Sequence, residues 1–462
     1  MRKGRTILIY TLVMLLTLVL LAGCQAQPAA QPTQAPSTEP IDDVTPEPTA
    51  EPQAGKAKED FTGTVQYWTK DTTWADAMQE PFAAAYPNIE VTYTPIEWFD
   101  YLQKLTTTIA SGTQMPDVIC ATVEWRMRVF EMGVSENLEA EPYNLDRNDM
   151  FEYLWPRCED PDGHIVGLEM QLTPSGLGYR KDIAEQVWGV KEREDIEKLF
   201  KDAGDNYDAY VTLGKQILEK TDGKVKMFAG LGDIYAMVYA QDDTPLINED
   251  GSVNLTERVL PTLEVVKKFK DAGIVSTYDQ WTPQWEASYA SGEVFCYPWT
   301  TWTTGSVRDT RDPDGAGHWG LMIPPYGAFS WGGTTMGVCK DSQNKEATWE
   351  YVRWCNWDLE GAKVAADKKD YQVSRISNYE KDPSLSSKYD DYYEMDLFKF
   401  WAEDAVDSAI AVTPTVYDQI VMDAIHVSLT ALQANPDMTA QDMMDMVKTE
   451  VTNKVESGVV VN

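Results

Sequence analysis

The chain has 462 residues and a formal net charge of −35, with 43% of its residues hydrophobic and 11% aromatic. This length is enough for two sizeable lobes rather than one core. A surface so acidic repels phosphate backbones, which excludes nucleic acid as a partner and argues mildly against a polyanionic ligand. One buried basic pocket would override that mean field, and most acidic surfaces simply keep a protein soluble.

The first residues form an export signal. A basic start is followed by an uncharged apolar run over residues 7–21, which is short for a membrane span and typical of a secretory signal. The run ends in Leu-Ala-Gly before Cys24, which resembles the bacterial lipobox. That resemblance implies cleavage before Cys24 and a diacylglyceryl group on its thiol. We therefore predict a signal peptide over residues 1–23 and a chain anchored by lipid on the extracellular face of the cell membrane. The alternative is a plain signal peptide with an accidental cysteine.

Residues 24–60 are predicted to form a disordered tether. They are rich in Pro, Ala, Gln, Thr and Glu and carry almost no large apolar side chains. Such a segment cannot bury enough surface to offset its ordering entropy. It is typical of a flexible, partly polyproline spacer between a membrane anchor and a folded part.

The cysteines, histidines and acidic residues do not have the spacing expected of a metal site. Five cysteines remain after Cys24, none at metal-ligand spacing, and we expect buried unpaired thiols, with one disulfide left open: Cys120, Cys158, Cys296, Cys339 and Cys355. The histidines stand far apart without zinc-type spacing and are expected to be structural: His164, His318 and His426. Three aspartates before Gly315 are faintly similar to a calcium loop but lack the rest of that motif, so a polar turn is favoured: Asp309, Asp312 and Asp314.

The first part of the folded chain alternates strands with helices. We predict strands over residues 64–68, 89–93 and 117–121, and helices over residues 74–86, 98–111 and 124–132. This alternation is the signature of a doubly wound α/β lobe. Ligands in such sheets bind outside the carboxyl ends of the strands. The residues there include Lys70 and Asp71 after the first strand, and Thr122, Glu124 and Trp125 after the third.

The later part of the chain contains a second set of strands and helices. Strands are expected over residues 164–168 and 177–180, around the loop 169–175, and helices over residues 181–220. Further strands are expected over residues 227–231, 293–298, 318–323 and 335–338. An amphipathic helix covers residues 260–272, and helices dominate after residue 345. No internal repeat is evident.

Four local motifs, in this order behind the lipobox, identify the chain as similar to a known family. They are SGTQMPDV over residues 111–118, GYRKD over residues 178–182, SGE leading to Trp299 and Trp302, and Gly-Gly at 332–333 before a strand and helix. From about residue 61 to its end the chain resembles the family 1 extracellular solute-binding proteins, the group that includes maltose-binding protein. Each motif alone is weak, and their order and spacing carry the assignment.

The resemblance implies a type II periplasmic-binding-protein-like fold. Its two α/β lobes would each be a doubly wound sheet flanked by helices, with a hinge cleft between them. The N-lobe would comprise residues 61–170 plus 331–372, and the C-lobe residues 171–330 plus 373–462. The family supplies mono- or oligosaccharides to an ABC-type importer, whose membrane subunits and cytoplasmic ATPase would be the partners of a monomeric binding protein.

A carbohydrate pocket needs flat aromatic rings for apolar C–H faces and polar groups for the hydroxyls. The resemblance aligns Trp302 with a sugar-stacking tryptophan, and Trp299 stands three positions earlier. Trp331 precedes Gly332 at a lobe crossing where backbone must approach closely. A packing role is the alternative for each indole.

The other candidate ligand contacts rest on position or on the resemblance. Thr173 stands where the family carries a binding carboxylate, which puts that contact in doubt. An ordinary solvated turn, a helix first-turn acid or a surface charge is the alternative for several of them. The full candidate set is Lys70, Asp71, Thr122, Glu124, Trp125, Gln171, Thr173, Asp233, Tyr235, Trp299, Trp302, Trp331, Gly332, Arg375 and Tyr417.

These observations predict a binding protein without catalytic residues, metal or cofactor. No nucleophile elbow, phosphate-binding loop or dinucleotide fingerprint is present, and carboxylates are too abundant for any acid pair to be informative. A non-sugar solute such as a polyol, organic phosphate or peptide is the alternative ligand. An extracellular carbohydrate-active enzyme is the alternative from another class.

Overall fold

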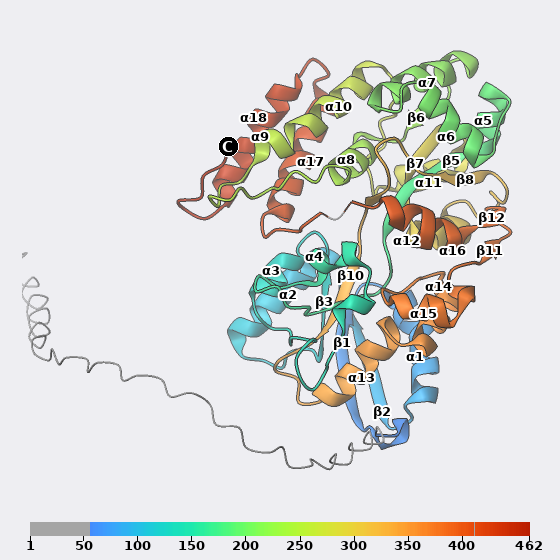
Figure 1. Cartoon of the computed structure of the whole chain (residues 1–462). Helices are drawn as coiled ribbons and strands as arrows, with labels where there is room; N and C mark the ends of the chain where they lie inside the picture. The colour runs from blue at the N-terminus through green and yellow to red at the C-terminus, as the bar shows by residue number, and fades with distance from the viewer. Residues whose placement is uncertain (1–55, 411) are drawn as a thin grey trace, which may run out of the picture. The chain divides into compact units, whose positions relative to one another are not determined.

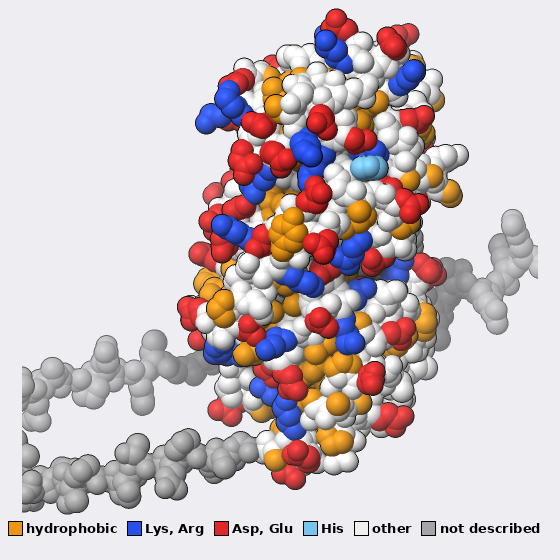
Figure 2. Space-filling view, turned by 90° about the vertical axis from the view of Figure 1, so that its right-hand side faces the viewer, with side chains coloured by type: hydrophobic (Ala, Val, Ile, Leu, Met, Phe, Trp, Pro, Cys, Tyr) orange, Lys and Arg blue, Asp and Glu red, His pale blue; other side chains and the backbone are white. Residues whose placement is uncertain are grey.

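The computed structural model describes residues 56–410 and 412–462. The predicted signal peptide, the lipidated Cys24 and the tether up to residue 55 lie outside the described residues. Within the described ranges, no helix combines the length and apolar character that a membrane crossing requires. Figure 2 shows acidic and basic side chains mixed over one face of the molecule.

The last residues of the predicted tether are ordered. The chain forms a 3-10 turn at Lys58–Asp60, and Lys56 binds Glu346 at 2.7 Å. Lys58 also pairs with Glu360. Residues 56–60, at the end of the predicted tether, therefore contact helices far along the chain, and the extent of the tether stays a prediction.

The first sheet has five strands in the order β2-β1-β3-β10-β4. β1 runs parallel to β2 and β3, whereas β10 is antiparallel to both β3 and β4. The expected strand–helix alternation therefore produces the parallel part, and a strand from late in the chain completes the sheet (Figure 1). The strands are β1 (Gly63–Thr69), β2 (Ile89–Pro95), β3 (Val118–Thr122), β4 (Leu168–Glu169) and β10 (Thr334–Val338).

Helices cover both faces of this sheet. Successive side chains of a strand point to opposite faces. Tyr67 of β1 packs on Tyr351 of α13 at 5.6 Å, whereas the next residue, Trp68, packs on Tyr101 of α2 at 5.9 Å. The helices are α1 (Thr72–Ala85), α2 (Trp98–Ser111), α3 (Arg126–Glu131), α4 (Trp155–Cys158), α13 (Lys345–Asn356), α14 (Leu359–Lys369) and α15 (Ile376–Lys381).

The second sheet has the order β6-β7-β5-β8, with β9 paired to β5. β6 and β7 are parallel, and β5 is antiparallel to β7, β8 and β9. Both central strands, β5 and β7, are buried at every residue. The strands are β5 (Pro174–Arg180), β6 (Lys226–Phe228), β7 (Val294–Thr300), β8 (Trp319–Met322) and β9 (Phe329–Ser330), and a separate hairpin joins β11 (Tyr389–Asp390) to β12 (Met395–Asp396).

The helices of this part pack around an aromatic and aliphatic core. Tyr210, Phe228 and Phe269 lie within 5.9 Å of one another there. The helices are α5 (Lys181–Trp188), α6 (Arg193–Asp202), α7 (Tyr207–Lys220), α8 (Leu231–Ala240), α9 (Leu255–Arg258), α10 (Leu260–Asp271), α11 (Pro283–Ser291), α12 (Thr301–Ser306), α16 (Leu397–Lys399), α17 (Asp418–Ala434) and α18 (Ala440–Lys454).

The chain passes between the two sheets more than once. It leaves β4 at Glu169 and enters β5 at Pro174, and it returns from β9 at Ser330 to β10 at Thr334. The Leu172 N–H donates to the carbonyl of Gln372 at 2.7 Å, so a third segment lies beside the first passage. The lobe limits at residues 170, 330 and 372 stay a prediction.

The five cysteines among the described residues are buried and unpaired, as predicted. Burial raises the pKa of the Cys120 and Cys158 thiols to about 12, so they stay protonated at neutral pH. They act as small apolar core residues.

Candidate ligand-binding site

Four tryptophans from three segments gather into one cluster, which we call the indole group: Trp281, Trp285, Trp302 and Trp331. The ring centroids of Trp302 and Trp331 lie 4.8 Å apart. Trp281 lies 5.7 Å from Trp331, 5.8 Å from Trp302 and 5.2 Å from Trp285. Trp285 is fully buried, Trp302 and Trp331 are half-buried, and Trp281 is exposed. The group thus has a buried base and a face open to solvent.

Local structure explains how Trp302 and Trp331 meet. β7 ends at Thr300, whose capping box starts α12, so Trp302 lies in the first turn of that helix. Trp331 lies in the passage from β9 to β10, and its carbonyl accepts a hydrogen bond from Trp302 Nε1 at 3.4 Å. Gly332 follows with φ +79°, and a Cβ there would lie 3.1 Å from that same nitrogen. A glycine is needed for this close approach.

Arg311 supports the base of the indole group. Its guanidinium lies 5.0 Å from the ring centroids of both Trp285 and Tyr289, and 6.0 Å from that of Trp302. Glu286 of α11 pairs with this arginine. The guanidinium attracts the aromatic rings electrostatically, and this attraction helps to hold the rings in position.

Asp233 holds the segment that carries Trp281 and Trp285. Its side chain is fully buried and accepts hydrogen bonds from Gly230 N at 2.9 Å, Gln280 Nε2 at 2.8 Å and Trp285 Nε1 at 3.0 Å. The prediction that Asp233 contacts ligand does not fit this geometry, because burial and three donors occupy the carboxylate. It positions the indole group instead.

This buried carboxylate gives a prediction about pH and stability. Burial raises the pKa of Asp233 to about 7, although its hydrogen bonds act in the opposite direction. The folded chain therefore holds the proton more tightly than the unfolded chain, so the contribution of Asp233 to stability is largest at low pH and is lost as pH rises towards 7. We expect the melting temperature of the wild type, relative to Asp233→Asn, to fall between about pH 4 and pH 7.

Asp250→Asn is the control for this measurement. Hydrogen bonds to Ser252 lower the pKa of the exposed Asp250, so its contribution changes only as pH falls below the ordinary aspartate range. Its difference from wild type should be flat over the same interval. A flat difference for Asp233→Asn as well would contradict the raised pKa.

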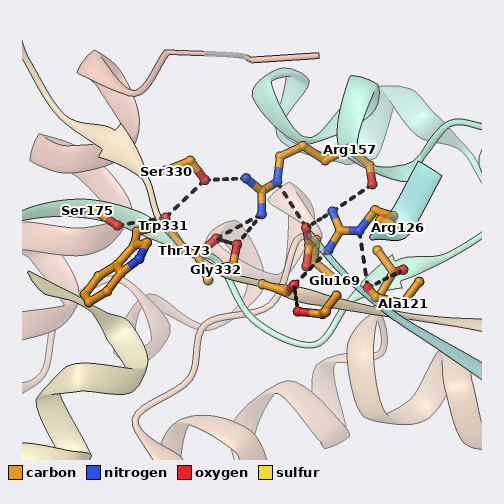
Figure 3. Close-up of polar contacts among 12 residues, drawn as sticks. Ala121, Arg126, Arg157, Glu169, Thr173, Ser175, Ser330, Trp331 and Gly332 are labelled. Atoms are coloured by element: carbon orange, nitrogen blue, oxygen red, sulfur yellow. Dashed lines mark hydrogen bonds and ion pairs between the residues drawn. The ribbon is translucent and has the colours of Figure 1, made fainter. Parts of the chain in front are cut away.

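A second feature lies directly beside the passages between the sheets: two arginines share one glutamate in the interior (Figure 3). Arg126 Nη1 and Arg157 Nε lie 2.7 and 3.1 Å from Glu169 Oε1, and the three side chains are at most 5% exposed. We call these residues the buried charge cluster. One carboxylate for two guanidinium groups leaves an excess positive charge in the interior.

Backbone and hydroxyl oxygens of both passages bind the excess charge. Arg157 donates to Ser330 Oγ at 2.5 Å and to the Gly332 carbonyl at 2.6 Å, and Arg126 donates to the Gly333 carbonyl at 3.0 Å. The Thr173 carbonyl accepts from the Trp331 N–H at 3.4 Å. Thr173, predicted to contact ligand, is buried and joins the two passages, as Figure 3 shows.

Comparison with known proteins shows the family to which this chain belongs. The family profile described as "Bacterial extracellular solute-binding protein" matches residues 77–371. The chain belongs to this family of bacterial extracellular solute-binding proteins. A Brucella abortus relative whose name describes it as a binding protein is 25% identical over 303 residues, covering 62% of this chain and 69% of the relative.

Solved structures share the fold. A crystal structure of an extracellular solute-binding protein family 1 member has a TM-score of 0.74 at 16% identity, covering 84% of this chain and 99% of that one. The galacto-N-biose/lacto-N-biose I-binding protein of an ABC transporter from Bifidobacterium longum, in complex with lacto-N-biose, has a TM-score of 0.65 at 16% identity, covering 87% and 99%. The two-lobed type II fold predicted from the sequence is thereby confirmed.

Several predicted contacts of this solute-binding protein lie after the strands of the first sheet. Asp71 caps α1 by accepting from Trp74 N at 2.9 Å, and Lys70 lies 3.4 Å from Glu97. Thr122 is buried and donates to Glu124 at 3.0 Å. Glu124 is partly exposed and keeps the position expected of a ligand contact.

Trp125 and Gln171 are packed in the interior of the protein. Trp125 is 4% exposed and stacks on Tyr101 with centroids 5.0 Å apart. Gln171 is buried, and its side-chain oxygen accepts from Thr301 Oγ1 at 2.9 Å. Their predicted contact with ligand is not accessible in this structure.

Trp299 is a core residue in this structure. It is fully buried, 4.9 Å from Trp319, and a Cβ on Gly178 would lie 1.9 Å from its ring. The structure therefore separates Trp299 from the indole group, and its predicted ligand contact does not fit. The reason is its place in β7, a strand buried on both faces.

Three further candidates also lie apart from the indole group. Tyr235 is 8% exposed and packs on His426 at 5.5 Å, and Tyr417 donates to Glu456 at 3.3 Å. Arg375 pairs with Asp149 at 2.7 Å and lies over Trp357 beside a surface cavity of about 220 Å³. These partners are not members of the indole group, although burial, and to a smaller extent the nearby Glu124 carboxylate, raises the pKa of Tyr235.

Five residues of the site were missed at the sequence level: Trp281, Trp285, Arg126, Arg157 and Arg311. The spacing W-x-x-x-W over residues 281–285, with Pro283 opening a helix, was the available signal for the two indoles. No sequence signal was available for the three arginines, because their partners are far away in the sequence.

The predicted absence of a metal stays a prediction. One group of three ligand-type side chains stands close together among the described residues, Asp160, Asp162 and His164. Asp160 Oδ1 accepts from the backbone N–H groups of the other two, which is the geometry of a polar turn. Asp312, from the faint calcium motif, accepts instead from Trp319 Nε1 at 2.8 Å.

Proposed function

We propose that this solute-binding protein captures a carbohydrate at the indole group and delivers it to an ABC-type importer. The observation that carries the proposal is the half-exposed surface of Trp281, Trp302 and Trp331 beside the passages between the sheets. Apolar sugar faces stack on indole rings, and this requires no charge. The sugar-bound Bifidobacterium longum structure, with its named ABC transporter, supports the same assignment by its fold.

Closure of two lobes supplies the mechanism. The indole group lies before and on α11, on α12 and in the passage from β9 to β10, whereas Glu124 follows β3 of the first sheet. A ligand held by the indoles would gain contacts from the first lobe as the hinge closes. Ligand shifts the open–closed equilibrium only by its extra affinity for the closed form.

The arginines that a phosphate ligand would need already bind carboxylates or carbonyls of the protein. Arg126 and Arg157 are buried against Glu169 and backbone carbonyls, and Arg375 binds Asp149. Lys70 has Glu97 beside it. These contacts favour a neutral sugar over an organic phosphate. The buried, fully hydrogen-bonded Asp233 is likewise no candidate for a glycosidase acid.

A ligand screen tests the proposal. We expect the melting temperature of the purified protein to rise with at least one member of a panel of mono-, oligo- and uronic saccharides. The same sugar should change the tryptophan emission and should be recovered unhydrolysed. Binding only to polyols, peptides or phosphates, or to no member of the panel, would contradict the assignment.

The lipid anchor has its own test. Cys24 provides the only thiol at the predicted cleavage site, so Cys24→Ser should abolish incorporation of labelled fatty acid in a bacterial host and release the protein from the membrane fraction. Cys120→Ser is the matched control, because that thiol is buried in β3, and it should leave the labelling unchanged. Labelling that persists in Cys24→Ser would end the lipoprotein assignment.

A further inference from the structure

Trp281 is the most unusual residue of the indole group. Among tryptophan side chains that the structure describes, it alone is exposed, at 55% of its surface. Its φ is +66°, in the left-handed region. A bulky L-residue rarely adopts that conformation, so the surrounding structure must hold it there.

Hydrogen bonds on both sides hold Trp281 in this conformation. Before it, the Tyr278 N–H donates to the Ala229 carbonyl at 3.1 Å, and Gln280 donates to the buried Asp233 at 2.8 Å. After it, the Thr282 side chain caps α11 by accepting from Trp285 N at 3.3 Å. The backbone on both sides of Trp281 is therefore held by hydrogen bonds, which fixes the position from which its ring extends.

Trp281 contacts the two half-buried indoles of the group and the buried one. Its ring packs on the buried Trp285 and is tilted by 35° from both Trp302 and Trp331. An aromatic ring that rests on one indole and leaves more than half of its surface in water has apolar area to offer to a ligand.

The size of this surface bears on the length of the ligand. The apolar face of one sugar unit covers about one indole ring, and three adjacent indoles are partly exposed here. A monosaccharide would leave at least one of these rings in water. A chain of two or more units can cover neighbouring rings together and so bury more apolar surface.

We propose that Trp281 is a specificity-determining residue that selects oligosaccharides over monosaccharides by stacking on an additional sugar unit. The proposal rests on the carbohydrate-binding function argued above. In this proposal, Trp302 and Trp331 stack on a sugar unit that short and long ligands share. Trp281 stacks on a further unit that only longer ligands have.

Trp281→Asn tests the proposal without adding backbone strain, because asparagine tolerates positive φ. Tyr326→Asn is the matched control: Tyr326 is 56% exposed with φ +71°, but its ring packs on Tyr207 and not on the indole group. Affinities for a series from one to six units of the sugar found in the screen are measured by calorimetry for both variants and the wild type.

We expect Trp281→Asn to weaken binding of ligands with two or more units at least tenfold and to change binding of the monosaccharide less than twofold. Trp281→Phe should restore part of the loss, and Tyr326→Asn should bind every length like the wild type. Equal losses at every length, or no loss in a folded Trp281→Asn variant, would overturn the proposal while the carbohydrate function stands. Failure of the wild type to bind any sugar would overturn both.

Discussion

Glu169→Gln is expected to lower the free energy of unfolding by about 3–5 kcal/mol, because it leaves two guanidinium groups buried without a carboxylate. Arg126 and Glu169 are fully buried and Arg157 is 5% exposed, so water cannot replace the lost partner. The carbonyls of Gly332 and Gly333 would still accept hydrogen bonds from the arginines but carry no charge. Urea denaturation measures the effect.

Two further variants distinguish this mechanism from a general loss of packing. Glu139→Gln removes a carboxylate from the half-buried Arg147, which keeps Glu159, and should cost less than about 1 kcal/mol. Combining Glu169→Gln with Arg126→Met should be less destabilising than Glu169→Gln alone, because only one unpaired charge remains. Additive losses in the double variant would refute an electrostatic origin.

The buried charge cluster also bears on the hinge. Arg157 binds Ser330 and Gly332 on one passage and lies 3.4 Å from Thr173 on the other. A Cβ on Gly333 would lie 2.6 Å from its guanidinium. One side chain therefore fixes the two passages relative to each other, beside Trp331. Loss of the Arg157 contacts is expected to lower the stability of the protein and to disturb the closure of the two lobes around a ligand.

Much of the fold could be predicted from the sequence because local pattern decides it. The apolar run at 117–121 gives β3, and the predicted helix over residues 98–111 coincides with α2. These elements depend on periodicity and on nearby glycines. By contrast, the addition of β10 as an antiparallel strand beside β3 depends on pairing more than 200 residues apart, for which periodicity gives no signal.

The candidate site was harder to predict because neighbouring residues take opposite roles. Trp299 and Trp302 stand three positions apart, yet the first lies in a strand buried on both faces and the second in the helix that begins at Thr301. The sequence motif could not locate that change from strand to helix to the residue. Trp281 escaped prediction because its role arises from contacts with three indoles and from a backbone held by Asp233.

Trp302→Ala is expected to reduce affinity for the sugar found in the screen about a hundredfold, a loss of about 2–3 kcal/mol. Trp302 contacts both Trp331, at 4.8 Å, and Trp281, at 5.8 Å, so its removal takes away one of the three partly exposed rings and a neighbour of the other two. It also frees the Trp331 carbonyl that accepts from its Nε1. The loss should therefore affect ligands of every length, unlike the length-dependent loss expected of Trp281→Asn.

Trp188→Ala controls for the mere loss of an indole in the same part of the chain. Trp188 ends α5, packs on Phe295 at 5.3 Å and donates to Gln216 at 2.6 Å, away from the indole group. Its affinity for sugar should equal that of the wild type, whereas its emission spectrum should no longer contain the Trp188 component. If Trp302→Ala is folded by circular dichroism and still binds the sugar within twofold of the wild type, the indole group is a packing cluster and the ligand binds elsewhere. A loss at Trp302 that Trp188 does not share supports the partly exposed rings as the surface on which the ligand rests, because each variant removes one half-buried indole and one hydrogen bond of its Nε1.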